Sequence, residues 1–505
     1  MKRTEELFSL IHSLNKHEKR FFKLSASIES GEKQYMQMFD IIAHQSVYDE
    51  KEILAKLKIT KNVLSFQKNY LQRLILNKIA SLSSSKRAQV RNLLTQADIL
   101  FNKGLYSLHH KLLKKAKELA KQNDLNDYLL EISTMEHTLA WRNQQLPEAA
   151  KALEEKKENI SQLQIEIQYH RLANKIITRL AQLGTARSTK EMQELKKLVN
   201  DPLIRNEKKA VTFRCKNLVL HTLSLYHSLA GDPLKEYKYC KKNVELFLAN
   251  PEKTELSIQN FLFALHTAIH ACNRLKRYDQ SKYYLDLMQQ NYSRVNTERE
   301  KIWIFYNFHD NNLDYYIRTG KFKEGVPEVE KLTQALQLEE HKLDKMVNLI
   351  LYSQIARLYF GAENFSKCIE WLNKILSQED ILRLRPDIEM QIKLFYLIAH
   401  FEKGHEDLIP HLTRSLHRYL SSKKRLYKFE NILLDYLGKR LFRADSKKEM
   451  LDQFKNLKKD LLPLASDNYE KIPLLSFDYL SWIESKIENR KFSEIVKEKS
   501  RQLSH

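Results

Sequence analysis

Apolar residues recur at helical spacing from the start of the chain. In residues 4–14 they fall on one face of a helix: Leu7, Leu10, Ile11 and Leu14. The same period predicts further helices over residues 33–43, 50–57 and 63–82, and it breaks at the polar run from Ser83 to Arg87. The pattern therefore predicts a small helical N-terminal domain over residues 1–82.

From residue 88 to residue 505 a longer unit recurs, in which a helix ends, a polar turn carries an aromatic residue, and a second helix returns. The turn aromatics are Tyr106, Tyr278, Phe322, Phe365 and Phe492. Three positions later the second helix is expected to meet the first, and small residues stand there in several units: Ser281, Gly325 and Cys368. Large apolar residues follow four positions further on and are expected to pack on the first helix: Leu113, Leu285, Val329 and Leu372.

This order of residues resembles the second half of the tetratricopeptide repeat. The resemblance implies a right-handed α-solenoid, a superhelix of roughly nine or ten hairpins whose concave face binds a protein or peptide. A small helical domain before such an array is also similar to the plan of bacterial tetratricopeptide regulators.

The chain departs from the family pattern in two ways. Successive turn aromatics in its middle stand roughly 43 residues apart, against 34 in the strict repeat. The tryptophan and glycine typical of the first helix are mostly absent, so no peptide-binding residue of the family can be assigned here. Less regular hairpins are expected to turn at Pro147, Gly184, Gly231, Gly404 and Asp445, one of them spanning residues 165–200.

Composition favours an all-α fold. Only 9 Gly and 9 Pro occur among 505 residues, so tight turns, β-hairpins and phosphate-binding glycine loops are expected to be scarce. The four cysteines, at 215, 240, 272 and 368, form no C-x-x-C pair, which favours the reducing cytoplasm over a disulfide framework or zinc ribbon. Charged residues interrupt every apolar run before it reaches the length of a signal-peptide core or membrane span.

The formal net charge of +22 admits nucleic acid, an acidic protein or an anionic membrane surface as partner. About half of the excess lies in the first 125 residues. Lys and Glu alternate along most of the expected helices, so a solvated lysine-rich surface is the favoured explanation of the charge.

No strong catalytic motif occurs. The sequence contains no G-x-x-x-x-G-K-[ST], G-x-G-x-x-G, G-x-S-x-G or H-E-x-x-H, so we expect neither enzymatic activity nor a cofactor. His266 and His270 have the i, i+4 spacing of helical zinc ligands, but Cys272 projects about 240° around the helix from His266 and cannot complete a site locally. Packing positions in a helix explain the histidine pair better.

Basic residues in the N-terminal domain are candidates for nucleic-acid binding. Lys19, Arg20 and Lys23 interleave with two phenylalanines. The segment 52–74 also resembles a helix-turn-helix, with Lys58 at the usual glycine and with side chains that would face the major groove: Asn62, Ser65, Gln67 and Lys68. The alternative is a helical bundle that caps the solenoid.

Two further groups are candidate contact sites. Lys423, Lys424 and Arg425 could hold a phosphate, or could form an ordinary basic loop between repeats. Four tyrosines could line an aromatic groove for a partner, or could pack between helices: Tyr283, Tyr284, Tyr315 and Tyr316. Together the patterns predict a scaffold that binds a protein or peptide; the alternative is a nucleic-acid-binding regulator that uses the solenoid as sensor.

Overall fold

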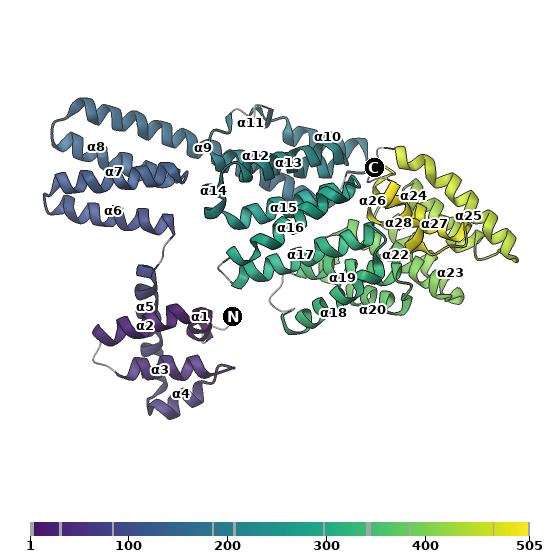
Figure 1. The fold of residues 1–505 in the computed structure, drawn as a ribbon, viewed down its shortest axis with the longest axis horizontal. Coiled ribbons are helices and arrows are strands. Elements are labelled where there is room, and N and C mark those ends of the chain that lie inside the picture. Colours follow the sequence, from purple (N-terminus) through teal and green to yellow (C-terminus); the bar gives the residue numbers. More distant parts are fainter. Residues whose placement is uncertain are drawn as a thin grey trace. The chain divides into compact units, whose positions relative to one another are not determined.

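The computed structural model describes residues 5–29, 33–82, 85–183, 186–205, 209–295, 298–339, 345–382, 385–467 and 469–502. Over these ranges it contains helices and no strand, which confirms the all-α prediction (Figure 1). The chain divides into two compact units, Met1–Leu163 (unit 1) and Gln164–His505 (unit 2). In the same ranges, no helix combines the length and the apolarity that crossing a bilayer requires.

Unit 1 begins with five helices around one apolar core. They are α1 (Glu6–Ser13), α2 (Lys16–Glu29), α3 (Lys33–His44), α4 (Glu50–Leu57) and α5 (Lys61–Leu82). Four of them match helices expected from the apolar period. The sequence pattern did not predict α2, which is rich in charge; its fully buried Phe22 packs on Phe39 of α3, with ring centroids 4.8 Å apart. The predicted break after α5 begins at Ser83 and Ser84, which lie outside the described residues.

The rest of unit 1 consists of α6 (Lys86–Asn102), α7 (Tyr106–Gln122), α8 (Asn126–Arg142) and the first part of α9 (Leu146–Leu183). Their turns repeat every twenty residues, with a left-handed residue at Gly104, Asp124 and Gln144. The next residue donates its N–H to the carbonyl five positions back: Leu105 to Leu100, Leu125 to Ala120, and Gln145 to Ala140. This pairing satisfies carbonyls that a helix end leaves free.

The same turn recurs in unit 2, with a left-handed residue at Gly231, Lys276, Gly320, Glu363, Gly404, Lys424 and Asn489. The scarcity of glycine therefore does not make tight turns scarce, contrary to the expectation from composition. Among the described residues, Lys, Asp, Gln, Glu and Asn occupy seven left-handed positions, each at a cost of roughly 1–2 kcal/mol. Four of the turn aromatics follow two positions after such a residue: Tyr106, Tyr278, Phe322 and Phe365.

Unit 2 contains the second part of α9 and then α10 (Thr189–Val199), α11 (Pro202–Arg205), α12 (Phe213–Leu229), α13 (Pro233–Leu248), α14 (Pro251–Leu256), α15 (Ile258–Arg274), α16 (Tyr278–Asn291), η3 (Tyr292–Arg294), α17 (Glu298–Arg318) and α18 (Phe322–Glu339). These are followed by α19 (Lys345–Gly361), α20 (Phe365–Leu376), α21 (Glu379–Leu382), α22 (Pro386–Lys403), η5 (Glu406–Leu408), α23 (Ile409–Ser422) and α24 (Lys428–Asp435). The last elements are η6 (Tyr436–Arg440), α25 (Lys447–Leu461), η7 (Leu462–Ser466), α26 (Ile472–Ser476), α27 (Tyr479–Ile487) and α28 (Phe492–Gln502).

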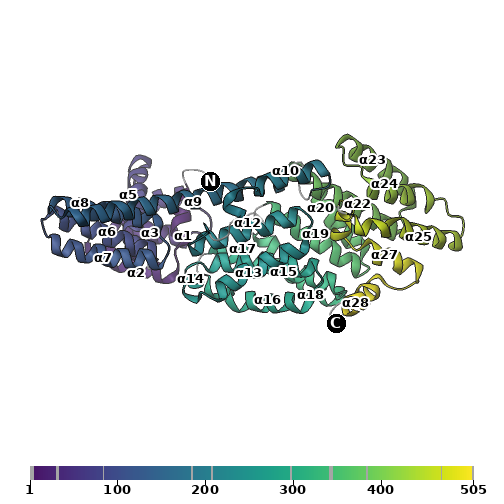
Figure 2. The ribbon, with the colours of Figure 1, turned by 90° about the horizontal axis from the view of Figure 1, so that it is seen from above.

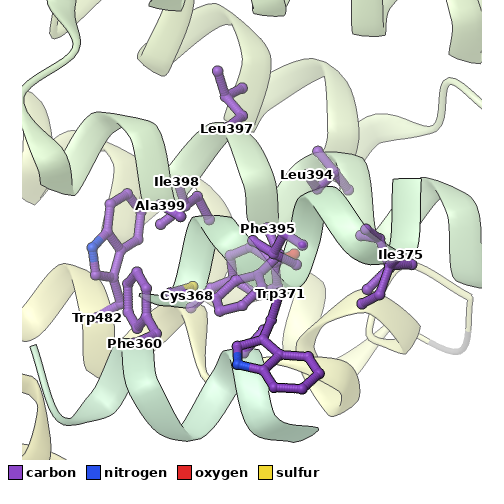
Figure 3. Packing of buried hydrophobic residues seen from close by; sticks show 14 of the residues in the cluster. Phe360, Cys368, Trp371, Ile375, Leu394, Phe395, Leu397, Ile398, Ala399 and Trp482 are labelled. Atoms are coloured by element: carbon purple, nitrogen blue, oxygen red, sulfur yellow. The ribbon is translucent and has the colours of Figure 1, made fainter. Parts of the chain in front are cut away.

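Consecutive helices of unit 2 pack as hairpins: α12 with α13, α15 with α16, α17 with α18, and α19 with α20. The packing predictions are confirmed. Ser281 and Cys368 are fully buried, and a Cβ at Gly325 would lie 2.7 Å from Leu358 of α19. The expected large apolar positions are buried as well: Leu113, Leu285, Val329 and Leu372. Figure 3 shows Cys368 beside Phe360 and Phe395 in the largest core.

The last helix of unit 2 packs back on the middle of the unit, where α28 contacts α17 and the turn after it (Figure 2). At that turn a Cβ on Gly320 would lie 2.6 Å from the backbone nitrogen of Lys497. The Phe322 and Phe492 ring centroids are 5.6 Å apart. The solenoid interpretation predicted hairpins that pack only on their neighbours; here a late helix closes on one about 170 residues earlier.

A second long-range contact joins the start of unit 2 to its C-terminal part. The guanidinium of Arg187 forms an ion pair with Glu430 of α24, and both side chains are buried. Glu470 lies 3.6 Å from the same guanidinium. Unit 2 is therefore tied together by contacts between segments more than 240 positions apart.

The start of one predicted hairpin is wrong, although helices do lie on both sides of its expected turn. Residues 165–200 were expected to begin a new hairpin, but α9 runs unbroken for 38 residues through that start. The sequence between Ile160 and Leu183 contains no glycine or proline, so nothing ends the helix there. Gly184, the expected turn, lies outside the described residues.

Candidate functional site

Unit 2 contains a partly open cavity of about 250 Å³ where its C-terminal segment returns to its middle helices. Its walls come from the ends of α15 and α17, from α19, from the segment around α26 and from α28. Part of the wall is aromatic: the ring of Phe492 lies 5.6 Å from that of Phe322 and 5.7 Å from that of Phe477. The lining also holds five basic and two acidic side chains: Arg274, Lys276, Arg318, Arg357, Lys471, Asp314 and Asp478.

Two of the arginines are already paired. Arg318 Nε lies 2.9 Å from both carboxylate oxygens of Asp314, which also accepts a hydrogen bond from Asn273 Nδ2 at 2.8 Å. Burial disfavours the charged form of Arg318, but the adjacent Asp314 outweighs burial and raises the pKa of Arg318. Arg274 donates to Glu236 Oε2 at 2.7 Å. These contacts hold the two guanidinium groups in the wall.

Arg357 of α19 is different. It lines the cavity, and across the described ranges no group accepts a hydrogen bond from it or forms an ion pair with it. Burial lowers the pKa of Arg357; Asp314 opposes this effect and Arg318 adds to it. A guanidinium carries five N–H donors and stays protonated in proteins, so these donors face the cavity without an acceptor.

A polar seam joins α15, α17 and α19. Asp310 Oδ2 lies 3.2 Å from His270 Nε2, and Asp310 Oδ1 accepts from Gln354 at 3.1 Å. Asn311 donates to Nδ1 of His266 at 2.8 Å. Burial lowers the pKa of His266 to about 3. Burial also opposes charge on His270 and Asp310, but their mutual hydrogen bond raises the pKa of His270 and lowers that of Asp310.

His266, His270 and Asp310 also place three possible metal-ligand atoms within 4.8 Å of one another. The hydrogen bonds of His266 argue against this use. Asn311 Nδ2 also donates to the carbonyl of Asn307 at 2.8 Å, which fixes the amide so that His266 Nδ1 accepts. A metal-bound histidine instead donates its second ring N–H to an acceptor. The residues fit a partly buried ion pair with hydrogen-bonded neighbours better than a metal centre.

The structure does not bring the four candidate tyrosines into one groove. Tyr283 is half exposed at the surface of α16, whereas its neighbour Tyr284 is buried in the core. Tyr315 and Tyr316 are partly buried, and each packs against a different core cluster. These side chains pack mainly between helices, with Tyr283 the most exposed of the four.

The three basic candidates of α2 differ in exposure and in pairing. Lys19 is partly buried and Arg20 is exposed. Lys23 pairs with Asp40 of α3 at 2.6 Å, and its nitrogen lies 5.8 Å from the centroid of the Phe39 ring. One of the three cations is therefore engaged within the unit.

The helix-turn-helix candidate forms two helices with a left-handed Lys58 (φ +54°) at the position that the motif gives to glycine. Asn62 of α5 is exposed. Gln67 is buried and donates to Gln34 of α3 at 3.1 Å, while Lys68 hydrogen-bonds Tyr48 and pairs with Glu50 at 2.9 Å. Gln67 and Lys68 thus hold the helices together, and Asn62 remains outward, as does Ser65.

The third basic candidate lies at the turn between α23 and α24. Lys423 and Lys424 are exposed, and Lys424 is the left-handed residue of the turn. Arg425 lies 3.8 Å from Glu191 of α10, so it belongs to the contact between the two ends of unit 2. Its neighbour Tyr427 packs under the Arg187 guanidinium at 4.2 Å.

A second hollow, of about 1,110 Å³, runs between α23 and the π-helical η6. A π-helical turn is rare and is often found at functional sites. Gly438 stands where η6 crosses α23, because a Cβ there would overlap Thr413. The basic side chains of this groove are His411, Arg414, His417, Arg418 and Lys439, with Asp435 opposite in charge.

Sequence reasoning missed Arg357, although a signal was present. Nearly every residue of α19 from Asn348 to Gly361 is buried, on all sides of the helix. An arginine inside a helix that is apolar all round is rarely left without a specific role.

No protein-family model matches this chain, and the comparison with curated proteins gives no match. The tetratricopeptide resemblance therefore rests on the turns of this chain alone.

Proposed function

We propose that the protein is a non-enzymatic interaction scaffold whose unit 2 binds a segment of a protein or peptide partner. The cavity lined by Arg318, Arg357 and Phe492 carries this proposal, because it combines unused donors with an aromatic wall. Binding sites of this kind join a mostly apolar lining to a few placed polar groups. As part of the proposal, the hairpins of unit 2 form a tetratricopeptide-like right-handed superhelix with this cavity on its concave side.

The titratable groups of unit 2 support a binding role rather than a catalytic one. All four cysteines are buried and none is in a disulfide, and burial raises the pKa of Cys240 and Cys272 to about 12. Such thiols are poor nucleophiles because the thiolate is the reactive form. His266 and His270 are used in the polar seam between α15 and α17. We also propose that the protein is cytoplasmic, because cysteines outside disulfides fit a reducing compartment.

The test is affinity capture with the full-length protein at about 150 mM salt, with and without nuclease. A defined protein should remain bound after nuclease treatment. The variant Leu474→Trp, which adds bulk to the cavity wall, should release it; Leu462→Trp makes the same change at an exposed site and should not. Retention of the partner by Leu474→Trp would place binding elsewhere and reject the cavity.

A second function, nucleic-acid binding by unit 1, is favoured by one observation: Lys58 adopts the left-handed turn of the motif and leaves Asn62 exposed on α5. In that case capture would recover nucleic acid, and affinity would fall steeply with salt because each neutralised phosphate releases counterions. Asn62→Ala would then weaken sequence-specific binding. Loss of all binding after nuclease treatment would favour this function over the scaffold.

A further inference from the structure

The cavity has an excess of positive charge, and two of its three arginines are already paired. Arg318 is paired with Asp314, and Arg274 with Glu236. Asp478 caps α27 by accepting the Ser481 N–H at 3.0 Å. Arg357 is left with donors that no group in the described chain accepts. Arg357 is partly buried in a helix whose other residues are nearly all buried. A charge-assisted hydrogen bond in such a partly desolvated site is stronger than one at the surface, so an anion that supplies acceptors gains more here.

The apolar part of the wall limits what can accompany the anion. Phe322 is buried and Phe477 and Phe492 are partly buried, and their rings touch around the cavity with Ile317 and Val496 beside them. The volume of about 250 Å³ is below the roughly 300–1,000 Å³ of pockets that hold drug-sized ligands. The space therefore suits one apolar side chain rather than an extended molecule.

We propose that this cavity binds a carboxylate joined to a single apolar group, with the Arg357 guanidinium donating to both carboxylate oxygens. A planar carboxylate matches the fork of a guanidinium. Two sources supply this chemistry: the C-terminus of a polypeptide with an apolar last residue, and a free small carboxylic acid. The polypeptide source rests on the proposed scaffold function.

The experiment is a calorimetric titration of the full-length protein with three probes: N-acetylphenylalanine, a decapeptide ending in phenylalanine, and the same peptide with an amidated C-terminus. The two free carboxylates should bind, and amidation should weaken binding about 10- to 100-fold, as expected for lost charge-assisted hydrogen bonds. Binding of the small acid alone would keep the carboxylate site and reject the peptide scaffold. Binding of the peptide alone would identify a polypeptide C-terminus. Equal binding of the amidated peptide, or no binding of any probe, would overturn the proposal.

Variants separate recognition from folding. Arg357→Met should abolish carboxylate binding without lowering the melting temperature, because it removes a partly buried cation that has no partner in the described chain. Arg357→Lys should retain partial binding, since it keeps a point charge but not the fork. Lys403→Met makes the same change in charge at an exposed position and should bind as the original protein does. A melting temperature lowered by several degrees in Arg357→Met would show that Arg357 has a structural partner, and would also overturn the proposal.

Discussion

The two units are built from similar helices and the same kind of turn, but the contacts between their helices differ. In unit 1, polar links between helices join nearby segments, such as His12 to the carbonyl of Ile42, 30 positions on, and Arg87 to Asp127, 40 positions on. In unit 2, buried polar links join Arg187 to Glu430, 243 positions away. Repetition of a hairpin therefore does not by itself make a chain one-dimensional. Unit 2 escapes the nearest-neighbour rule of repeat arrays because its ends meet.

The difference in contacts is clearest for Arg187 of unit 2 and Arg87 of unit 1. The Arg187–Glu430 pair is buried on both sides, so removing Arg187 leaves a carboxylate that has lost its counterion. We expect Arg187→Ala to destabilise unit 2 by about 3–5 kcal/mol. Arg87→Ala breaks the half-exposed pair with Asp127 in unit 1 and should cost less than about 1 kcal/mol. Hydrogen exchange of the full chain during urea unfolding measures the free energy of unfolding of each unit separately.

The pH dependence of Arg187→Ala provides its control. Burial raises the pKa of Glu430 even with Arg187 present. A carboxyl group whose folded pKa is raised favours the folded state at low pH, and this contribution is lost as pH rises. The destabilisation should therefore be larger at pH 8 than at pH 5. A loss in unit 2 below 1 kcal/mol at pH 8 would mean that its ends meet without depending on this pair.

The second test concerns close packing within unit 2. A Cβ at Gly361, near the end of α19, would overlap the buried ring of Phe322. Gly361→Ala should destabilise unit 2 by roughly 1–3 kcal/mol, and Phe322→Leu should relieve part of that loss. Gly104→Ala in unit 1 meets open space, so its cost comes only from the positive φ. Denaturant midpoints are compared for the three single variants and for the double variant Gly361→Ala/Phe322→Leu. If Phe322→Leu shifts the midpoint equally with and without Gly361→Ala, the two side chains do not clash directly.

The sequence predicted what local pattern determines. The period of apolar residues located α1, α3, α4 and α5, and the turn aromatics located the hairpins α15–α16, α17–α18 and α19–α20. The burial of Cys368 and Leu372 followed from their spacing after Phe365. These features depend on residues a few positions apart, where helix geometry alone decides which side chains face inward.

The cavity could not be predicted in the same way. Arg357 and Phe492 are 135 positions apart, and nothing near either residue indicates that α28 returns to α17. The glycine count also misled, because Lys276 and Glu363 take the left-handed positions that glycine usually fills. Long-range closure depends on the fit of whole surfaces, such as Gly320 against α28, and a single sequence does not display that fit.

The third test concerns His221 of unit 2. Burial lowers the pKa of His221 to about 4, so the folded unit keeps this ring neutral where the unfolded chain protonates it. Stability should therefore fall as pH drops from about 6.5 toward 4, by at most about 1.4 kcal/mol per pH unit for this residue. His221→Phe should remove on the order of 2 kcal/mol of the loss between pH 7 and pH 4.5. Melting temperatures at the two values measure it, and parallel losses in both proteins would show that His221 is not responsible.

The smallest expected effect concerns the turns that the two units share. Glu363 has φ of +64° in the turn between α19 and α20 of unit 2, and Gln144 has +59° in the turn between α8 and α9 of unit 1. Glycine adopts this conformation without a Cβ penalty but loses more freedom on folding, so each change to glycine should stabilise its unit by less than about 1 kcal/mol. Ala362→Gly, one position earlier, should instead destabilise unit 2 by a similar amount. If the turns are equivalent, Glu363→Gly and Gln144→Gly will shift the denaturation midpoints of their units in the same direction. A gain in only one unit would show that closure of unit 2 strains its turns differently from those of unit 1.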